Sequence, residues 1–462
     1  MKYTIREFEM ESKFSQAVRL EALHQAISQE QIVQALQATG RVTLRERKLN
    51  LVLTVWALIG MGLWACALEH VLRYLVQGTR LAWWAPDWVL PGKSALTYRR
   101  QQVGVRPLAV LCRRVCQPLA DAATPQAFHF GLRLVALDGT VDAVADTPAN
   151  AQVFGRANNK YGASAYPQVR GVHLVECATH ALLDVTFWPY RRSEQHGAMR
   201  VMRSVQAGWL VMWDAGLQSC DLVQAATQRG AQVLARLPRG VKPVRVATLP
   251  DGTWLADLRP ADPVRRRAGV AVRVRIIEYQ LTDPALPGYH KPYRLVTTLL
   301  DPERYPAVEV VETFLTRWEF EVTLDEVETH QRLSATPVRG HAPRSCLQEL
   351  YGLVLAHYAI RTLMAAAAQH AHLAPTQLSF THAIEIVRQA VVEFQLIAPV
   401  AHEQLRQRLF TDLAAAQLPP RRFRTAPRVV KCRVSKFMRK KPVTPPPLKP
   451  TATSFRDCIQ LI

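Results

Sequence analysis

Hydrophobic positions in the first 125 residues recur at helical spacing. The segment SQEQIVQALQATG (residues 28–40) begins with Ser28, a residue type that caps helix N-termini, and carries Gln31 at the capping-box position. Gly40 ends the segment, as glycine often does at a helix C-terminus. A basic helical segment follows around residues 99–114. The pattern predicts an all-helical N-terminal domain over residues 1–128, and small helices with basic edges suit a DNA-binding role.

One predicted helix of this domain has no polar face. LVLTVWALIGMGLWACAL (residues 51–68) contains eighteen residues without a charge, the lower limit for a helix that crosses a membrane. Gly60 and Gly62 interrupt it, and Glu69 and His70 follow directly. The segment also begins too far from the N-terminus for a signal peptide. We expect a buried core helix, and no export signal or membrane partner.

From about residue 131 the pattern changes to short apolar runs typical of strands. Strand-like and helical segments alternate in the order 132–142 (LRLVALDGTVD), 167–179, 181–190, 194–207 (helix), 210–216 (LVMWDAG), 221–229 (helix) and 232–238. Three strands, helix, strand, helix, strand is the order of a ribonuclease-H-like α/β core. We therefore predict a ribonuclease-H-like catalytic domain over residues 129–400.

Residues 239–300 break this order. The alternating VAVRVRIIEYQL (residues 270–281) and the turn PDGT (residues 250–253) predict a β-rich insertion. Trp254 follows that turn, where it could stack on an unpaired base or pack inside the protein. Helices are expected near residues 344–373, 377–398 and 401–417, and a C-terminal helix and tail over residues 401–462.

Charge indicates the kind of partner. Lys and Arg number 58 against 37 Asp and Glu, so the formal net charge is +21 and the pI is about 10.0. This balance favours a polyanion, either nucleic acid or an anionic membrane. Residues 421–450 hold eleven of the cations and no acid: Arg421, Arg422, Arg424, Arg428, Lys431, Arg433, Lys436, Arg439, Lys440, Lys441 and Lys449. We expect this tail to bind the DNA backbone.

Two further features bear on partners and compartment. The loop GRANNKYG (residues 155–162) carries Arg156 and Lys160, which could approach DNA or belong to an ordinary surface loop. Of the eight cysteines, Cys112 and Cys116 are the closest pair, and no second Cys/His pair has zinc-site spacing. The cysteines are expected to be thiols of a cytoplasmic, nucleoid-associated protein.

Three acids stand out by position. Asp138 and Asp214 each come just beyond an apolar strand, and Glu321 lies in FLTRWEFEVTLDEVETHQ (residues 314–331), the next core helix after the insertion. In a ribonuclease-H-like core these positions converge, and three converging carboxylates repel one another without a cation. Oxygen-only ligands suit two Mg²⁺ ions, or Mn²⁺, in phosphoryl transfer.

The same helix allows a simpler interpretation. Acids on a solvated face would form i, i+4 ion pairs such as Arg317 with Glu321. That interpretation is kept for Glu319, Asp325 and Glu326, whereas Trp318 is expected to pack the helix onto the core. A solvated face needs no partner acids elsewhere in the chain, but a metal site does.

At this point the residues resemble a known family. The helix pattern Y-x(2)-R-x(3)-E-x(6)-K is the hallmark of the DDE transposases of bacterial insertion sequences, specifically the insertion-sequence-four family. Here it occurs as Phe314, Arg317, Glu321 and Glu328. Four other blocks resemble the family in the same order: LDGTVDAVADTPANAQVFGR, LVMWDAGLQSCDLVQAATQRGAQVLARL, PYRLVTTLLDPERYPA and QELYGLVLAHYAIRTLMAAAA.

The resemblance implies that Asp138, Asp214 and Glu321 form the metal-binding catalytic trio. It implies that Arg317 contacts a phosphate, with Phe314 and Glu328 at the neighbouring DNA-facing positions. Four residues depart from the family pattern. Phe314 replaces Tyr and Glu328 replaces Lys in the helix, and Ala215 and Leu217 replace Arg and Phe in a D-R-G-F run.

The resemblance implies an enzyme that binds the double-stranded inverted-repeat ends of an insertion sequence, cleaves them in a metal-dependent reaction and joins them to target DNA. Because two ends must be processed together, it also implies a homodimer in the DNA complex. The departures leave two alternatives open. One is a catalytically weakened, transposase-derived DNA-binding protein, and the other is a structure-selective nuclease with the same core.

Overall fold

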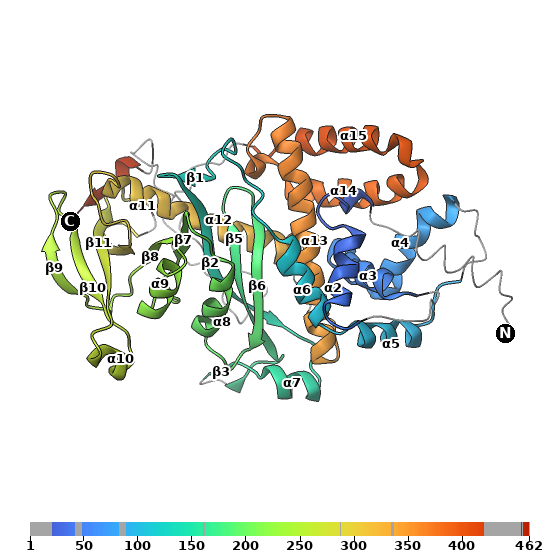
Figure 1. Cartoon of the computed structure of the whole chain (residues 1–462), viewed down its shortest axis with the longest axis horizontal. Helices are drawn as coiled ribbons and strands as arrows, with labels where there is room; N and C mark the ends of the chain where they lie inside the picture. The colour runs from blue at the N-terminus through green and yellow to red at the C-terminus, as the bar shows by residue number, and fades with distance from the viewer. Residues whose placement is uncertain are drawn as a thin grey trace, which may run out of the picture. The chain divides into compact units, whose positions relative to one another are not determined.

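A computed structural model of the chain describes residues 21–41, 49–82, 89–159, 162–286, 288–333, 337–419, 454 and 456–461 (Figure 1). The chain is a mixed α/β protein that divides into two compact units. Unit 1 comprises Met1–Phe128, Arg133–Ser204 and Trp318–Leu418, and unit 2 comprises His129–Leu132, Val205–Arg317 and Pro419–Ile462. The expected division into residues 1–128, 129–400 and 401–462 stays a prediction.

Unit 1 contains most of the helices. They are η1 (Glu21–Leu23), α2 (Gln29–Gln37), α3 (Leu51–Trp64), α4 (Leu68–Ala82), α5 (Lys93–Val103), α6 (Arg106–Val115), α7 (Pro148–Phe154), α8 (Glu194–Val201), η2 (Met202–Ser204), α13 (Pro343–His370), η5 (Pro375–Gln377), α14 (Phe380–Leu396), η6 (Pro399–Ala401) and α15 (His402–Ala415). The capping box predicted for α2 is confirmed. Ser28 Oγ accepts from Gln31 N at 3.2 Å, and Gln31 Oε1 accepts from Ser28 N at 2.8 Å.

Helix α3 is the apolar helix predicted to be buried, and nearly all of its residues are buried. It packs against α13 at two glycines: a Cβ on Gly62 would lie 2.8 Å from Leu353 Cα, and one on Gly352 would overlap the Leu58 carbonyl. Within the described ranges, α13 alone is long and apolar enough to cross a membrane, and 78% of its apolar window is buried inside the protein. Helices α3 and α4 meet that criterion only as a pair bent by 104°.

Three strands of unit 1 pair in antiparallel order: β2 (Leu132–Ala143), β5 (Gln168–Glu176) and β6 (Ala181–Pro189). The predicted strands and the turn between β5 and β6 are therefore confirmed. Strand β2 pairs with β5 without interruption from Val135↔Glu176 to Ala143↔Gln168. A short hairpin, β3 (Asn158–Asn159) with β4 (Gly162–Ala163), precedes β5. This regular register fixes which side chains of β2 share a face.

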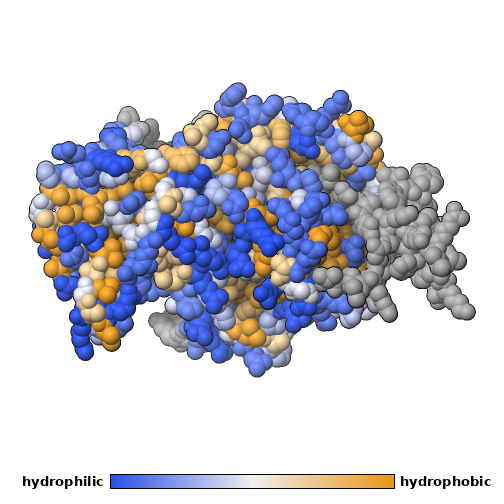
Figure 2. All heavy atoms as spheres, in the orientation of Figure 1, coloured by the Kyte–Doolittle hydropathy of each residue, from blue (hydrophilic) through white to orange (hydrophobic). Residues whose placement is uncertain are grey.

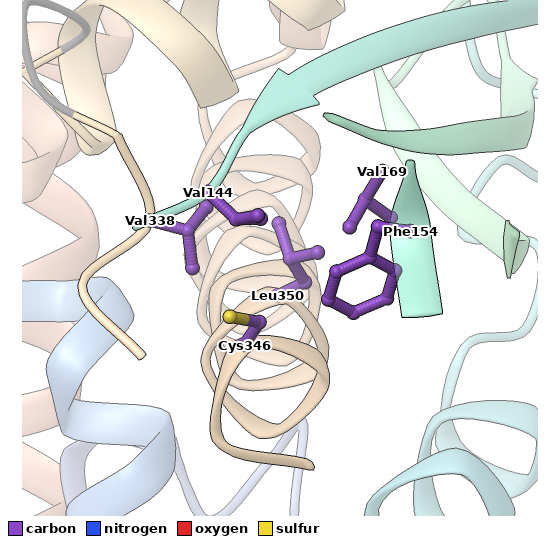
Figure 3. Packing of buried hydrophobic residues seen from close by; sticks show 6 residues of the cluster. All are labelled: Val144, Phe154, Val169, Val338, Cys346 and Leu350. Carbon is purple, nitrogen blue, oxygen red and sulfur yellow. The ribbon is translucent and has the colours of Figure 1, made fainter. Parts of the chain in front are cut away.

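A hydrophobic cluster fastens the end of β2 to α13 (Figure 3). Val144, just beyond β2, forms a parallel bridge with Val338, and both are fully buried. Phe154, Cys346 and Leu350 pack around them with 3% exposure or less. Because burying such side chains stabilises each by roughly 1.5–3 kcal/mol, the cluster orders the end of the strand that carries Asp138.

Unit 2 is built around strands. Its elements are β7 (Trp209–Trp213), α9 (Cys220–Thr227), β8 (Gln232–Arg236), β9 (Val244–Thr248), β10 (Trp254–Leu258), α10 (Pro263–Arg267), β11 (Val272–Leu281), β12 (Tyr293–Thr297), α11 (Ala307–Leu315), η7 (Arg456–Cys458) and β13 (Ile459–Leu461); β1 is Phe128–His129. Strands β7 and β8 are parallel, whereas β8, β12, β11, β10 and β9 pair in antiparallel order. The strand-rich character predicted for residues 239–300 is confirmed.

The surroundings of Trp254, beside β9 in unit 2, decide between stacking on a base and packing inside the protein. Trp254 is 7% exposed, and the Arg245 guanidinium lies 4.6 Å from its ring centroid, so the packing interpretation is correct. Val244 and Val246 on β9 are 53% and 46% exposed, and hydrophobic atoms reach the surface at this end of the unit (Figure 2).

Candidate functional site

Asp138 does not lie beyond the end of its strand, and that prediction is wrong. Strand β2 continues through Asp138 to Ala143 because its backbone goes on pairing with β5 as far as Gln168. Asp138 is half-buried, and its Oδ1 accepts from Gly139 N at 2.8 Å. Side chains alternate along a strand, so Asp138 and Asp142 share one face of β2.

The opposite face of β2 meets α8 at Gly139. A Cβ there would lie 2.9–3.1 Å from the side chain of Glu194. Glu194 itself pairs with Arg170, with Nη1 and Oε1 2.8 Å apart. Glu194 therefore makes a structural ion pair at the start of α8, and glycine next to Asp138 allows this close approach.

Asp214 follows β7 directly, as predicted. Its carboxylate is 42% exposed and lies 3.9 Å from the Arg236 guanidinium. Leu217, one of the departures from the family pattern, is 1% exposed. It therefore serves as a core residue in unit 2 and not as a DNA contact.

The helix that carries Glu321 is not regular. It runs as α11, a 3₁₀ turn (η3, Thr316–Trp318), α12 (Glu319–Asp325) and a π-helical segment (η4, Glu326–Gln331). The single regular helix predicted over residues 314–331 is thus wrong in detail. Single-turn π segments are rare inside α-helices and occur frequently at functional sites.

Acids of this helix meet the face of β2 that carries Asp138. Burial, with Asp142 nearby, raises the pKa of the Glu328 carboxyl to about 7, and Glu321 adds to this effect. Burial also raises the pKa of Asp142, although Arg332 forms an ion pair with it. Within unit 1, the Glu321 side of the helix and the Asp138 side of the strand are therefore linked by Asp142, Glu328 and Arg332.

Arg317 and Phe314 lie together in unit 2. The Arg317 guanidinium lies 5.8 Å from the Phe314 ring centroid, and Arg317 is 8% exposed. Its expected contact with a phosphate stays a prediction.

Two expectations for the neighbouring residues are wrong. Trp318 does not pack the helix onto the core: it is 43% exposed, and Phe320, with 0% exposure, occupies the buried position instead. Glu326 is not solvated either, since it is 5% exposed. Asp325 does fit the solvated interpretation, with a side chain 60% exposed and 3.4 Å from His330.

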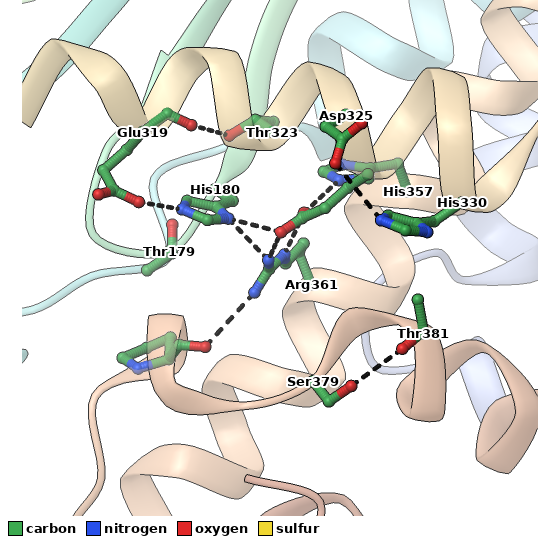
Figure 4. Close-up of polar contacts among 12 residues, drawn as sticks. Thr179, His180, Glu319, Thr323, Asp325, His330, His357, Arg361, Ser379 and Thr381 are labelled. Atoms are coloured by element: carbon green, nitrogen blue, oxygen red, sulfur yellow. Dashed lines mark hydrogen bonds and ion pairs between the residues drawn. The ribbon is translucent and has the colours of Figure 1, made fainter. Parts of the chain in front are cut away.

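Glu326 lies in a buried polar cluster that sequence reasoning missed. Figure 4 labels its partners His180, His357 and Arg361. Arg361 donates through both Nε and Nη2 to its carboxylate, and His180 and His357 lie 2.8 and 3.1 Å from it. Burial alone would raise the pKa of Glu326, but Arg361 and His180 hold it well below its usual range. The detectable signal was an Arg and a His inside the otherwise apolar LYGLVLAHYAIRTLMAAAA.

The predicted basic contacts are only partly described. Arg156 pairs with Asp146 and donates to the Ala165 carbonyl at 2.6 Å, so it orders its own loop. Lys160 and the cationic tail, Arg421, Arg422, Arg424, Arg428, Lys431, Arg433, Lys436, Arg439, Lys440, Lys441 and Lys449, lie outside the described residues.

The three acids of the predicted metal site are divided between the two units. Among the described side chains, no three His, Cys, Asp or Glu residues are grouped closely enough to hold a metal ion. Asp138 and Glu321 belong to unit 1, whereas Asp214 belongs to unit 2. The sharing of metal ions by these three carboxylates therefore stays a prediction.

Comparison with known proteins gives a consistent set of similarities. Residues 17–113 match the family model of the insertion element 4 transposase N-terminal domain. The chain is 29% identical over 430 residues to the transposase InsG for insertion sequence element IS4 of Escherichia coli (strain K12), covering 90% of this chain and 93% of that protein. The putative transposase InsZ of the same organism is 32% identical over 143 residues, which cover 30% of this chain and 48% of InsZ.

Among solved structures, a piggyBac transposase in a synaptic complex with hairpin DNA matches with a TM-score of 0.40 and 10% sequence identity. The match covers 85% of this chain and 84% of that one.

Proposed function

Because the chain belongs to the insertion element 4 family of transposases, we propose that it binds the inverted-repeat ends of an insertion sequence, cleaves them and transfers the freed strand to target DNA. The observation that carries this proposal is the meeting of two acidic faces in unit 1. The β2 face with Asp138 and the helix side with Glu321 are linked through Asp142 and Glu328.

The proposed core is ribonuclease-H-like. Three antiparallel strands, β2, β5 and β6, are followed along the chain by α8, β7, α9 and β8, and β7 is parallel to β8. This is the order of elements expected of that fold, with β9 to β12 as an insertion before the helix that carries Glu321.

The residues fit divalent cations of the Mg²⁺ or Mn²⁺ type. Asp138, Asp214 and Glu321 would hold two ions, and all three offer only oxygen ligands. Burial raises the pKa values of Asp142 and Glu328, so this side of unit 1 disfavours further negative charge, and a cation would relieve it. When bound, the ions would activate the attacking oxygen and stabilise the leaving oxygen of a phosphodiester.

The chain's own residues would position the DNA. In this proposal Arg317 neutralises a phosphate beside the scissile bond, with Phe314 holding its guanidinium in place. Arg332, next to Glu328, supplies positive charge on the side where the family has Lys. The cationic tail adds contacts to the backbone of any duplex, and a homodimer would bring two ends together.

Strand cleavage tests the proposal directly. Purified protein and Mg²⁺ should nick a duplex that carries the terminal inverted repeat flanking its own gene, and a target plasmid should receive the end. Asp138→Asn, Asp214→Asn and Glu321→Gln should each abolish nicking. Asp325→Asn is the matched control, because this acid lies on the same helix but is exposed, and it should leave nicking unchanged.

A catalytically weakened DNA-binding protein is the second candidate, and Glu328 is the residue that favours it. An anion at the position where the family has Lys opposes a phosphodiester. That candidate predicts end-specific binding without nicking in either Mg²⁺ or Mn²⁺. A third, the structure-selective nuclease, would nick but never join the end to target DNA.

A further inference from the structure

A buried group of charged and polar side chains lies behind the helix that carries Glu321. We call it the anchoring cluster and define it as Glu319, Glu326, His180, His357 and Arg361, all within unit 1; all of them except Glu326 are labelled in Figure 4. None of these residues belongs to the proposed catalytic trio. Four of the five are at least nine-tenths buried, the exception being Glu319, whose side chain is 19% exposed.

The cluster joins three separate parts of the chain. His180 lies in the turn between β5 and β6, with a positive φ of 58°. Its Nε2 is 2.8 Å from Glu319 Oε2, and its Nδ1 is 2.8 Å from Glu326 Oε1. One imidazole thus contacts two carboxylates of the same helix.

Helix α13 supplies the opposite side. Arg361 donates from Nε to Glu326 Oε2 at 2.9 Å and from Nη1 to the Pro375 carbonyl at 3.4 Å, and its guanidinium lies 5.3 Å from the Phe380 ring. His357 Nε2 is 3.1 Å from Glu326 Oε2. The carboxylate of Glu326 is therefore contacted from two directions.

Helix geometry places this cluster on the side away from Glu321. Residues seven apart, such as Glu319 and Glu326, project in nearly the same direction. Glu321 is two residues after Glu319, a rotation of about 200° on an α-helix. The cluster consequently holds the back of α12, on the side opposite Glu321 and Glu328, and Glu328 is close enough to Asp142 of β2 to interact with it electrostatically.

Two features indicate a role beyond stability. Buried ion pairs cost desolvation energy and stabilise a fold weakly, so their value lies more in specifying one arrangement. In addition, Glu326 is the first residue of the π segment, where the backbone departs from α-helical register. Such segments are rare inside α-helices and frequent at functional sites, and the Glu326 contacts occur at the first residue of this one.

From these contacts we propose that the anchoring cluster positions Glu321 for metal binding, with Glu326, His180 and Arg361 as positioning residues. The proposal rests on the proposed function, because Glu321 is a metal ligand only there. The cluster fixes α12 along and about its axis, and it holds the π segment in one register. Loss of the Glu326 charge should loosen α12 and weaken the metal site without removing any ligand.

Glu326→Gln tests the proposal by two independent measurements. Hydrogen–deuterium exchange on the protein without metal or DNA should show amides of residues 319–331 exchanging about tenfold faster, with peptides of α2 and α4 unchanged. The Mg²⁺ concentration for half-maximal nicking of the end duplex should rise about tenfold, as expected when a group that orients a metal ligand is removed. Mn²⁺ should restore much of the nicking rate.

Asp184→Asn is the matched control. Asp184 is also buried, and it accepts two hydrogen bonds of 2.9 Å from Arg203, but it lies on β6. It should lower thermal stability, and it should leave both the exchange of residues 319–331 and the half-saturating Mg²⁺ concentration unchanged.

Glu319→Gln keeps the test decisive if Glu326→Gln fails to fold. Its partly exposed side chain makes misfolding less of a risk, and the half-saturating Mg²⁺ concentration should rise about threefold. If the unaltered protein nicks the duplex and a folded cluster variant has the same half-saturating Mg²⁺ concentration, the positioning role is overturned. Absence of nicking by the unaltered protein would instead overturn the proposed function, and the exchange data would still report whether the cluster holds α12.

Discussion

Glu328 is the residue at which this chain departs most in charge from the insertion-sequence-four pattern that it resembles. Its carboxylate lies near Asp142, Arg332 and Glu321, and burial raises its pKa to about 7. Near neutral pH, a substantial fraction of it is protonated. The anion at the proposed DNA-facing position is therefore partly neutralised by its surroundings, and Arg332 offsets more of the charge.

Reversal of this charge should favour DNA. Glu328→Lys changes the local charge by up to two units, worth on the order of 1–3 kcal/mol in a partly desolvated site. We expect about a tenfold gain in nicking of the end duplex in Mg²⁺, and no nicking when Glu321→Gln is added. Unchanged or slower nicking would mean that Arg332 already fills the cationic role.

The raised pKa of Glu328 also predicts a pH-dependent stability. In the unfolded chain this carboxyl titrates near its ordinary value of 4.5, and in the folded protein it titrates near 7. Ionisation therefore favours the unfolded state as the pH rises from about 4.5 to 7, and the full cost applies above that window.

Glu328→Gln removes this cost. The variant should be more stable than the unaltered protein by about 1–2 kcal/mol at pH 8, after allowance for partial exposure, and equally stable at pH 4.5. Thermal unfolding at the two pH values measures the difference. Glu385→Gln, with a side chain 65% exposed, is the control, and an equal gain at both pH values would contradict the assignment.

Among the elements, the crossing of α3 and α13 depends on glycine. At Gly352 a Cβ would overlap the Leu58 carbonyl, which is backbone and cannot rotate away. The two helices can approach this closely only without a side chain there. The close approach fixes α13, the helix that supplies Arg361 and His357.

Gly352→Ala should therefore destabilise the protein by roughly 2–3 kcal/mol through overpacking. Gly240→Ala is the control, because a Cβ there would meet nothing within 4 Å. Chemical denaturation of both variants provides the comparison. Equal stability of the two would show that the helices can separate at no cost.

For the whole molecule, the cationic tail is a dense run of positive charge in the sequence: eleven cations and no acid between residues 421 and 450. Beyond it, β13 pairs with β11 in unit 2, and Cys458 is fully buried. Truncation at residue 419 would remove that strand as well, so charge replacement is the cleaner experiment.

Replacing the eleven cations by Gln should weaken binding to an end duplex and to a scrambled duplex alike. The slope of log affinity against log salt concentration should become shallower by several units. Each phosphate that the tail no longer neutralises reduces the slope by about 0.9. Fluorescence anisotropy at a series of salt concentrations measures this. A slope equal to that of the unaltered protein would assign the tail to a partner other than DNA.

Local sequence determined much of this protein. The Ser28 capping box, the burial of α3 and the end of β7 at Asp214 all follow from residues adjacent in the chain. Capping and hydrophobic periodicity act over a few residues, so their outcome can be deduced without knowledge of the fold. The order of strands and helices from β2 to β8 was accessible for the same reason.

Tertiary structure alone decided which acids are buried. Glu319 and Glu326 look like a solvated face, yet they meet His180 and Arg361, which lie 139 and 35 residues away respectively in the chain. Trp318 looks like a core anchor, yet it is 43% exposed. The charge of a side chain fixes what burial costs, but only distant partners decide whether that cost is offset. Sequence could therefore select Glu321 as the candidate ligand, whereas the contacts that hold its helix emerged only from the folded chain.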